Sequence, residues 1–276
     1  MAGCGTEDAH AAGIHMRLAY TTVASTLALS LFGACATDSS TVAGDDQLAG
    51  ETGDGEAAKA DGIDTFGIFT AQKVGAFECN GVGSCTHVAL TRANRSTTTC
   101  ADGSSKASCD VRTLDFSKLH LSSSKLADVQ AKLQASAATP EIGAQLLVRG
   151  AYVHGTNPTA PGVDWVTFQV TEVWAAQLPN GTLDGTFVMV GLNNIRCITA
   201  PCPTVSEARV NSTRQMNTEG LDWQDNAAQA PSALQDAISE AMGTPDGVIV
   251  TGFRTHDAAH SSTNLRTVEQ AFLRVK

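Results

Sequence analysis

The residues of this chain with the most distinctive spacing are its cysteines. Beyond the N-terminal region they are Cys79, Cys85, Cys100, Cys109, Cys197 and Cys202. No two of them have the C-x2-C spacing of a zinc ribbon or knuckle, which disfavours a structural metal site. In an exported chain, oxidation in pairs to disulfides is the chemistry that this set favours.

Three histidines form a second group with chemical potential. His154 stands alone, whereas His256 and His260 flank a short segment that includes Asp257. Neutral imidazole is a ligand for zinc and copper, so their convergence would make a metal-dependent enzyme an alternative. The interpretation that we favour is that they are solvated loop residues. The sequence therefore predicts no cofactor.

The segment from Cys197 to Pro203 is short, apolar and stiffened by proline. If its two cysteines are joined, it presents a preorganised loop, and such a loop binds at a low entropy cost. The residues that the loop would present are Ile198, Thr199, Ala200 and Pro201. Presentation to a protease, as an inhibitor, or to another partner competes with the simpler role of a structural turn, which we favour.

Familiar catalytic signatures are absent from the sequence. It has no G-x-S-x-G elbow, no H-E-x-x-H, no Walker loop and no Rossmann glycine pattern. The run Ser122–Lys125 contains S-x-x-K, but it directly precedes an expected helix, where N-capping is the role to expect. The sequence leans towards a protein that is not an enzyme.

The N-terminal part has the organisation of an export signal. One charge at Arg17 precedes an uncharged apolar run that ends at Ala34, and Cys35 follows. This order predicts a signal over residues 16–34, with residues 1–15 as an over-extended start. A transmembrane anchor is an alternative, although the apolar run is short for spanning a bilayer.

The end of this signal, Leu31-Phe32-Gly33-Ala34-Cys35, resembles a bacterial lipobox, from which it departs at Phe32. The resemblance implies that Cys35 is lipidated and anchors the chain to a membrane, at the outer membrane or cell surface. A plain secretory signal is the alternative, and it would leave the protein periplasmic or secreted. Residues 35–64 then read as a disordered tether.

Charge is concentrated in this tether. The chain has a net charge of −10, of which residues 36–64 contribute −7, from eight acidic residues against Lys59. The remainder is nearly neutral and has no basic stripe, which argues against a nucleic-acid partner. The expected partners are a membrane, through the lipid anchor, and an unknown protein or other envelope component.

The elements that position these residues occur twice, at a period of about 105 residues. The matched segments are Phe66–Phe69 with Phe187–Val190, Cys79/Cys85 with Cys197/Cys202, Asn94–Thr97 with Asn211–Arg214, Leu114–Phe116 with Leu221–Trp223, Thr139-Pro140 with Thr244-Pro245, Gly150 with Gly252, and His154 with His256. The two asparagines begin N-x-[ST] triplets, which we interpret as turns. Each copy ends in a β-rich run, Val166–Trp174 or Leu265–Val275.

Between these segments each copy has an amphipathic helix pattern. Val129, Leu133 and Ala137 match Leu234, Ile238 and Met242, and each set lies on one helical face. Pro231 and Gly243 stand where the second helix should begin and end. We therefore expect an α+β fold, mostly antiparallel β, built from two tandem β-β-α-β-β repeats over residues 65–180 and 181–276.

The duplication also suggests how the cysteines pair. Cys100 and Cys109 fall where the first copy is about ten residues longer than the second, so they are expected to close an inserted loop. The remaining cysteines are equivalent pairs. The sequence thus predicts the local bridges Cys79–Cys85, Cys100–Cys109 and Cys197–Cys202.

The run Asn194–Pro203, followed by Glu207–Ser212, resembles the hallmark of a family of uncharacterised bacterial lipoproteins, catalogued as a domain of unknown function. Asn94–Gly103 and Ala60–Asp64 are similar to other recurring segments of that family. The resemblance implies a shared fold and a surface location, and it implies no activity. The function we expect is that of an exported, lipid-anchored envelope or surface protein, acting as a binding or structural module.

Overall fold

The structure is a computed structural model. It describes residues 67–78, 84–138, 143–156, 164–198, 202–223, 230–257 and 263–276. The chain divides into residues 1–48 and 49–276, and the helices and strands that the structure describes belong to the second unit. The expected signal, Cys35 and the tether lie outside the described residues. So do Cys79, Thr199, Ala200, Pro201 and His260.

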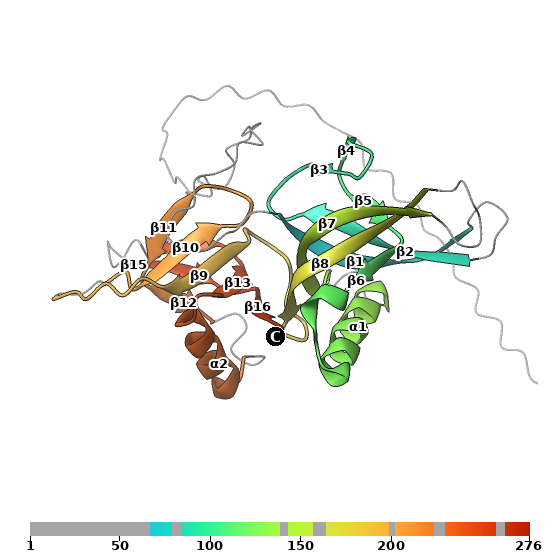
Figure 1. Cartoon of the computed structure of the whole chain (residues 1–276). Coiled ribbons are helices and arrows are strands. Elements are labelled where there is room, and N and C mark those ends of the chain that lie inside the picture. Colours follow the sequence, from blue (N-terminus) through green and yellow to red (C-terminus); the bar gives the residue numbers. More distant parts are fainter. Residues whose placement is uncertain are drawn as a thin grey trace, which may run out of the picture. The chain divides into compact units, whose positions relative to one another are not determined.

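Most of the strands form one 11-stranded sheet (Figure 1). In spatial order they are β11 (Gln215–Thr218), β10 (Val205–Arg209), β9 (Val188–Leu192), β13 (Val248–Thr251), β16 (Gln270–Arg274), β8 (Asp164–Ala176), β7 (Leu146–Thr156), β1 (Ile68–Glu78), β2 (Ser84–Arg92) and β5 (Cys109–Val111), while β6 (Thr113–Asp115) pairs with β8. All these pairings are antiparallel except that of β6. The expectation of a mostly antiparallel sheet is confirmed.

The other elements are small. A three-stranded sheet contains β12 (Gly220–Asp222), β15 (Thr263–Thr267) and β14 (Arg254–Asp257), and a two-stranded one contains β3 (Thr98–Thr99) and β4 (Ser105–Lys106). The helices are the 3-10 helix η1 (Ser117–Leu119), α1 (Ser123–Ala138) and α2 (Ser232–Met242). The Ser122 hydroxyl accepts a hydrogen bond from the Lys125 N–H at 3.4 Å, so this serine run starts a helix as expected.

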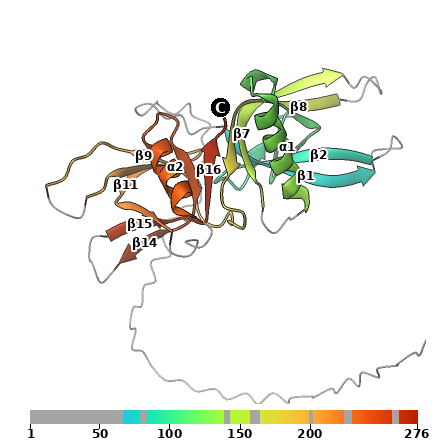
Figure 2. The same ribbon diagram turned by 90° about the horizontal axis from the view of Figure 1, so that it is seen from below.

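Both α-helices pack on the same face of the sheet (Figure 2). Val129 of α1 is 1% exposed and packs in a cluster that includes Ala175, while Ile238 of α2 is 1% exposed and packs in a cluster with Leu273. Ala175 and Leu273 are cross-strand partners, so their side chains leave the sheet on one side. The apolar stripes expected from the sequence are therefore the buried faces of the helices.

The strand order is the same in two parts of the sheet. From β2 it runs β2-β1-β7-β8, and from β10 it runs β10-β9-β13-β16, and the two series meet where β8 pairs with β16. We call the first series, with β5 and β6, the N-terminal half and the second, with β11, β12, β14 and β15, the C-terminal half. In the N-terminal half β6 runs parallel to β8, and in the other β12 runs parallel to β15.

Two glycines mark close approaches at corresponding places. A Cβ on Gly150 would lie 2.0 Å from the Gln169 carbonyl oxygen, and one on Gly252 would lie 1.9 Å from that of Thr267. Beside Gly150 the register of β7 shifts and the strand continues, whereas β13 ends before Gly252 and β14 starts a different sheet. Because β14 and its partner β15 belong to a different sheet, the β-rich run expected over Leu265–Val275 divides into β15 and β16 instead of forming one strand.

A reciprocal pair of asparagines joins the two halves. The Asn94 side chain donates to the carbonyls of Phe187 (2.7 Å) and Val210 (2.9 Å) and accepts from the Phe187 N–H at 2.9 Å. Asn211 donates to the carbonyls of Ile68 and Ala93, both at 2.8 Å, and accepts from the Ile68 N–H at 3.2 Å. We call these six hydrogen bonds the asparagine clamp.

The clamp connects places that are distant in the sheet. Ile68 begins β1 and Phe187 precedes β9, and four strands separate β1 from β9 in the sheet order. The sheet therefore bends until these two strands meet at their starts. Trp174 and Phe272, both at most 1% exposed, fill the inside of the bend together with Ile68 and Phe187. The sequence repeat predicts that Phe66 corresponds to Phe187. In the structure Ile68 corresponds to Phe187, because each of these two residues is bound in the same way by one asparagine of the clamp.

Replacing Asn211 with alanine should lower the free energy of unfolding by about 3 kcal/mol, because buried backbone groups at Ile68 and Ala93 lose their partners. Urea denaturation measures this value. Asn194→Ala is a matched control, since Asn194 has the same left-handed backbone (φ 57° against 58°) but is exposed and outside the clamp. Equal losses in both variants would show that the clamp contributes nothing beyond backbone conformation.

Candidate functional site

The connection between β9 and β10 is a loop closed by a disulfide. Cys197 is bonded to Cys202, with Cα atoms 5.6 Å apart, as the sequence predicts. The Cys100–Cys109 bridge is also present. The predicted Cys79–Cys85 bridge cannot be placed, because Cys79 lies outside the described residues. Local bridges of this length stiffen loops more than they hold distant strands together.

Exposed aliphatic side chains concentrate on this connection. Leu192, Ile195 and Ile198 are 47%, 43% and 104% exposed, and they account for three of the five large apolar side chains exposed among the described residues. We call residues 192–198 with Cys202–Thr204 the hairpin tip. Burial of apolar surface is the main favourable term in most protein association, so the tip is the part of this surface best suited to a contact.

The base of the tip is held by Asn193. Its amide nitrogen donates to the Pro203 carbonyl at 2.5 Å, and its amide oxygen accepts from the Ile195 N–H at 3.0 Å. Thr204 adds a backbone hydrogen bond from Asn193 at 3.0 Å. The two sides of the connection are therefore tied together at its base by hydrogen bonds and further out by the disulfide.

A groove of about 510 Å³ lies beside the tip. Its walls are formed by Met189, Leu192, Asn193, Asn194, Ser206, Glu207, Ala208, Gln215, Met216 and Asn217. Ser206 pairs with Asn217 and Ala208 with Gln215 across β10 and β11, so these four side chains project from one face of the sheet. This is the face opposite Val205 and α2.

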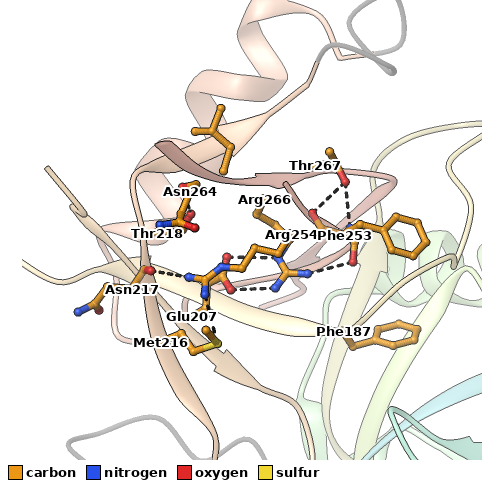
Figure 3. Close-up of polar contacts among 12 residues, drawn as sticks. Phe187, Glu207, Met216, Asn217, Thr218, Phe253, Arg254, Asn264, Arg266 and Thr267 are labelled. Atoms are coloured by element: carbon orange, nitrogen blue, oxygen red, sulfur yellow. Dashed lines mark hydrogen bonds and ion pairs between the residues drawn. The ribbon is translucent and has the colours of Figure 1, made fainter. Parts of the chain in front are cut away.

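Behind the groove, on the other face of β10, lies a buried ion pair (Figure 3). The Glu207 carboxylate accepts two hydrogen bonds from the Arg266 guanidinium, at 2.9 Å and 3.2 Å. The two residues are 2% and 3% exposed. Arg266 also donates to the Gly252 carbonyl at 3.0 Å. The pair links β15 to β10. Because Arg266 neutralises the Glu207 carboxylate, this group presents no uncompensated charge to the groove.

A second arginine completes this charged cluster. Arg254 of β14 donates to the Asn217 carbonyl at 2.5 Å and contacts the Met216 sulfur at 3.4 Å (Figure 3). Asn217 lies on β11, which is last in the order of the large sheet. Another strand can pair with a free carbonyl at a sheet edge. Here the Asn217 carbonyl already accepts a hydrogen bond from Arg254.

The corresponding positions of the N-terminal half are apolar. Leu114 of β6 lies beside Phe168, as Leu221 of β12 lies beside Arg266. Leu90 is paired with Cys109 of the neighbouring strand β5, as Glu207 is paired with Met216 of β11. Leu90 and Phe168 are both fully buried.

The ion pair was not predicted from the sequence. The strand alternation placed Glu207 on the face of Val205 and Arg266 on the face of Val268, two inward charges that could have been noticed. Pairing them required the tertiary structure, because the two residues are 59 positions apart.

Glu207→Leu should lower the free energy of unfolding by about 3–5 kcal/mol, because Arg266 is left buried without a counter-charge. The double variant Glu207→Leu, Arg266→Phe has at both positions the residue types of the N-terminal half, where Leu90 and Phe168 stand. It should recover most of the lost free energy of unfolding. Urea denaturation of the two single variants and the double variant gives the coupling energy. Additive losses would show that the pair is not coupled.

The structure does not bring the predicted histidines together by strand pairing. His154 lies on β7 opposite Val166 and is exposed, whereas His256 lies on β14 opposite Asn264, in the three-stranded sheet. His256 is thus on a strand and not in the loop that the sequence suggested. No group of three potential metal-ligating side chains occurs among the residues that the structure describes.

Fold and site together define a mostly antiparallel α+β protein with a disulfide-closed loop beside a neutral groove. Residues 79–276 match the family described as Domain of unknown function (DUF6748), and the chain belongs to that family. No curated protein and no solved structure matches the chain. The matched residues include every strand and helix of the fold except β1.

Proposed function

We propose that this protein is an exported binding module that contacts a partner through the hairpin tip. The observation that carries the proposal is the concentration of exposed aliphatic side chains, at Leu192, Ile195 and Ile198, beside a disulfide that ties the two sides of this connection together. Rigid apolar protrusions lose little entropy on binding and gain apolar burial. The module has no catalytic role in this proposal.

Export is supported by the disulfides. Bridges such as Cys100–Cys109 and Cys197–Cys202 persist in oxidising compartments and are rare in the cytosol. Among the described residues no helix is long and apolar enough to cross a membrane. The proposal has three further parts, which the sequence alone supports: a signal over residues 16–34, a lipid on Cys35, and a surface or outer-membrane location.

Lipidation predicts a specific mature chain. Protein isolated from its native cells should begin at Cys35, and its intact mass should exceed that of the residues by the mass of the attached lipid. Cys35→Ala should release the chain from the membrane fraction. A chain that begins elsewhere, or one that carries no added mass, would contradict the anchor.

We also propose that the two halves of the sheet are a duplication. The shared strand order, the matching parallel pairs β6–β8 and β12–β15, and the reciprocal bonds of Asn94 and Asn211 support it. In this proposal the second copy has diverged at the charged cluster, where Glu207 and Arg266 stand at the places of Leu90 and Phe168. That divergence argues for a role specific to the second copy.

A photo-crosslinking residue in place of Ile198 should trap a discrete partner in native cells, because Ile198 is the most exposed of the large apolar side chains that the structure describes. The same residue in place of Val153 is the control, since Val153 is 43% exposed but lies on β7 in the other half. Adduct at Ile198 and none at Val153, read by denaturing gel and mass spectrometry, is the expected outcome. Equal adducts at both positions, or none at either, would end the proposal.

A second candidate function is protease inhibition. A fully exposed Ile198 inside a disulfide-closed loop is the form in which a substrate-like residue is offered to a protease cleft. The identity of the crosslinked partner separates the two functions, because only the inhibitor would trap a protease at its active site.

A further inference from the structure

The groove beside the tip is lined by neutral hydrogen-bonding groups. Asn194, Gln215 and Asn217 are exposed amides, and Ser206 adds a hydroxyl. Amide side chains offer donors and acceptors side by side. Met189 and Leu192 supply aliphatic surface at the same groove. A volume of about 510 Å³ falls within the range of small-molecule sites.

Several of these polar groups are free to bind. Among the residues that the structure describes, no partner is found for the side-chain amides of Asn194 and Gln215 or for the Nδ2 group of Asn217. The Ser206 hydroxyl donates to the Gly191 carbonyl at 3.1 Å and can still accept. Asn193, by contrast, is used in holding the tip.

Charge excludes ionic ligands from this groove. Its lining contains no lysine, arginine or histidine, which disfavours an anion. Its one carboxylate, Glu207, is on the opposite face of β10 and is bonded to Arg266, which disfavours a cation. A ligand that matches this lining is uncharged and carries many hydrogen-bonding groups.

The sheet edge excludes an extended peptide added as a strand. Such a peptide would pair with the backbone of β11, and the Asn217 carbonyl at that edge already accepts a hydrogen bond from Arg254. Sugars need no sheet edge, because their hydroxyls bond to side-chain amides and their C–H faces pack on aliphatic groups. We infer that the groove formed by Asn194, Ser206, Gln215 and Asn217 binds a neutral carbohydrate.

The groove adjoins the tip and shares residues 192–194 with it, but Ser206, Gln215 and Asn217 lie outside the tip and Ile198 lies outside the groove, so the two proposals are tested at different residues. Purified full-length chain is examined by saturation-transfer NMR with chitotriose, cellotriose, maltotriose and xylotriose at millimolar concentration. A blocked neutral tripeptide and citrate are the comparison ligands. Calorimetry then gives the dissociation constant of each saccharide that binds.

Gln215→Ala and Asn217→Ala should each weaken saccharide binding about tenfold, the loss expected when one or two good hydrogen bonds to a ligand are removed. Asn217→Ala keeps the backbone carbonyl that Arg254 binds. Gln130→Ala removes another exposed amide, on α1, and should leave binding unchanged.

Saccharide binding that falls in both groove variants and persists in Gln130→Ala supports the site. The inference is overturned if none of the four saccharides binds, if only the tripeptide or citrate binds, or if binding ignores both substitutions. Circular dichroism shows that each variant is folded, so a loss of binding reports on the groove. A crosslink at Ile198 can be found with or without saccharide binding, which keeps the two proposals separable.

Discussion

The asparagine clamp is the constraint on which the form of the large sheet depends. A sheet of many strands can twist in the open, and nothing in its strand pairings alone brings β1 to β9. The side chains of Asn94 and Asn211 do so. Asn211 accepts a hydrogen bond from the Ile68 N–H and Asn94 accepts one from the Phe187 N–H. Each also donates to the carbonyl of the same residue, which accepts a backbone hydrogen bond as well. Because the bend encloses Trp174 and Phe272, the clamp also closes a hydrophobic core.

Within this frame the two halves use their interiors differently. The N-terminal half fills its core with Leu90 and Phe168, while the corresponding places of the C-terminal half hold Glu207 and Arg266. A buried ion pair adds little stability compared with an apolar core. Each of its charged groups, however, needs one specific partner, so the pair favours one arrangement of the strands. It fixes β10 relative to β15, and β10 carries both one side of the groove and one end of the hairpin tip.

The hairpin tip and the groove then share one rigid support. β9, β10 and β11 present neutral amides on one face, and the loop between β9 and β10 presents aliphatic side chains at its end. Arg254 occupies the carbonyl of Asn217 at the edge of β11, which discourages unspecific strand pairing there.

The local features could be predicted from the sequence: the amphipathic faces of both helices, the antiparallel character of the strands, and the Cys100–Cys109 and Cys197–Cys202 bridges. Each of them depends on residues that are near in the chain. The sequence also predicts turns at Asn94 and Asn211, but it does not predict the partners of their side chains. Those partners, like the Glu207–Arg266 pair and the groove walls, come from segments far apart in the chain. They become visible in the folded protein alone, because strand order and the bend of the sheet are set by packing between distant segments and leave no periodic pattern in the sequence.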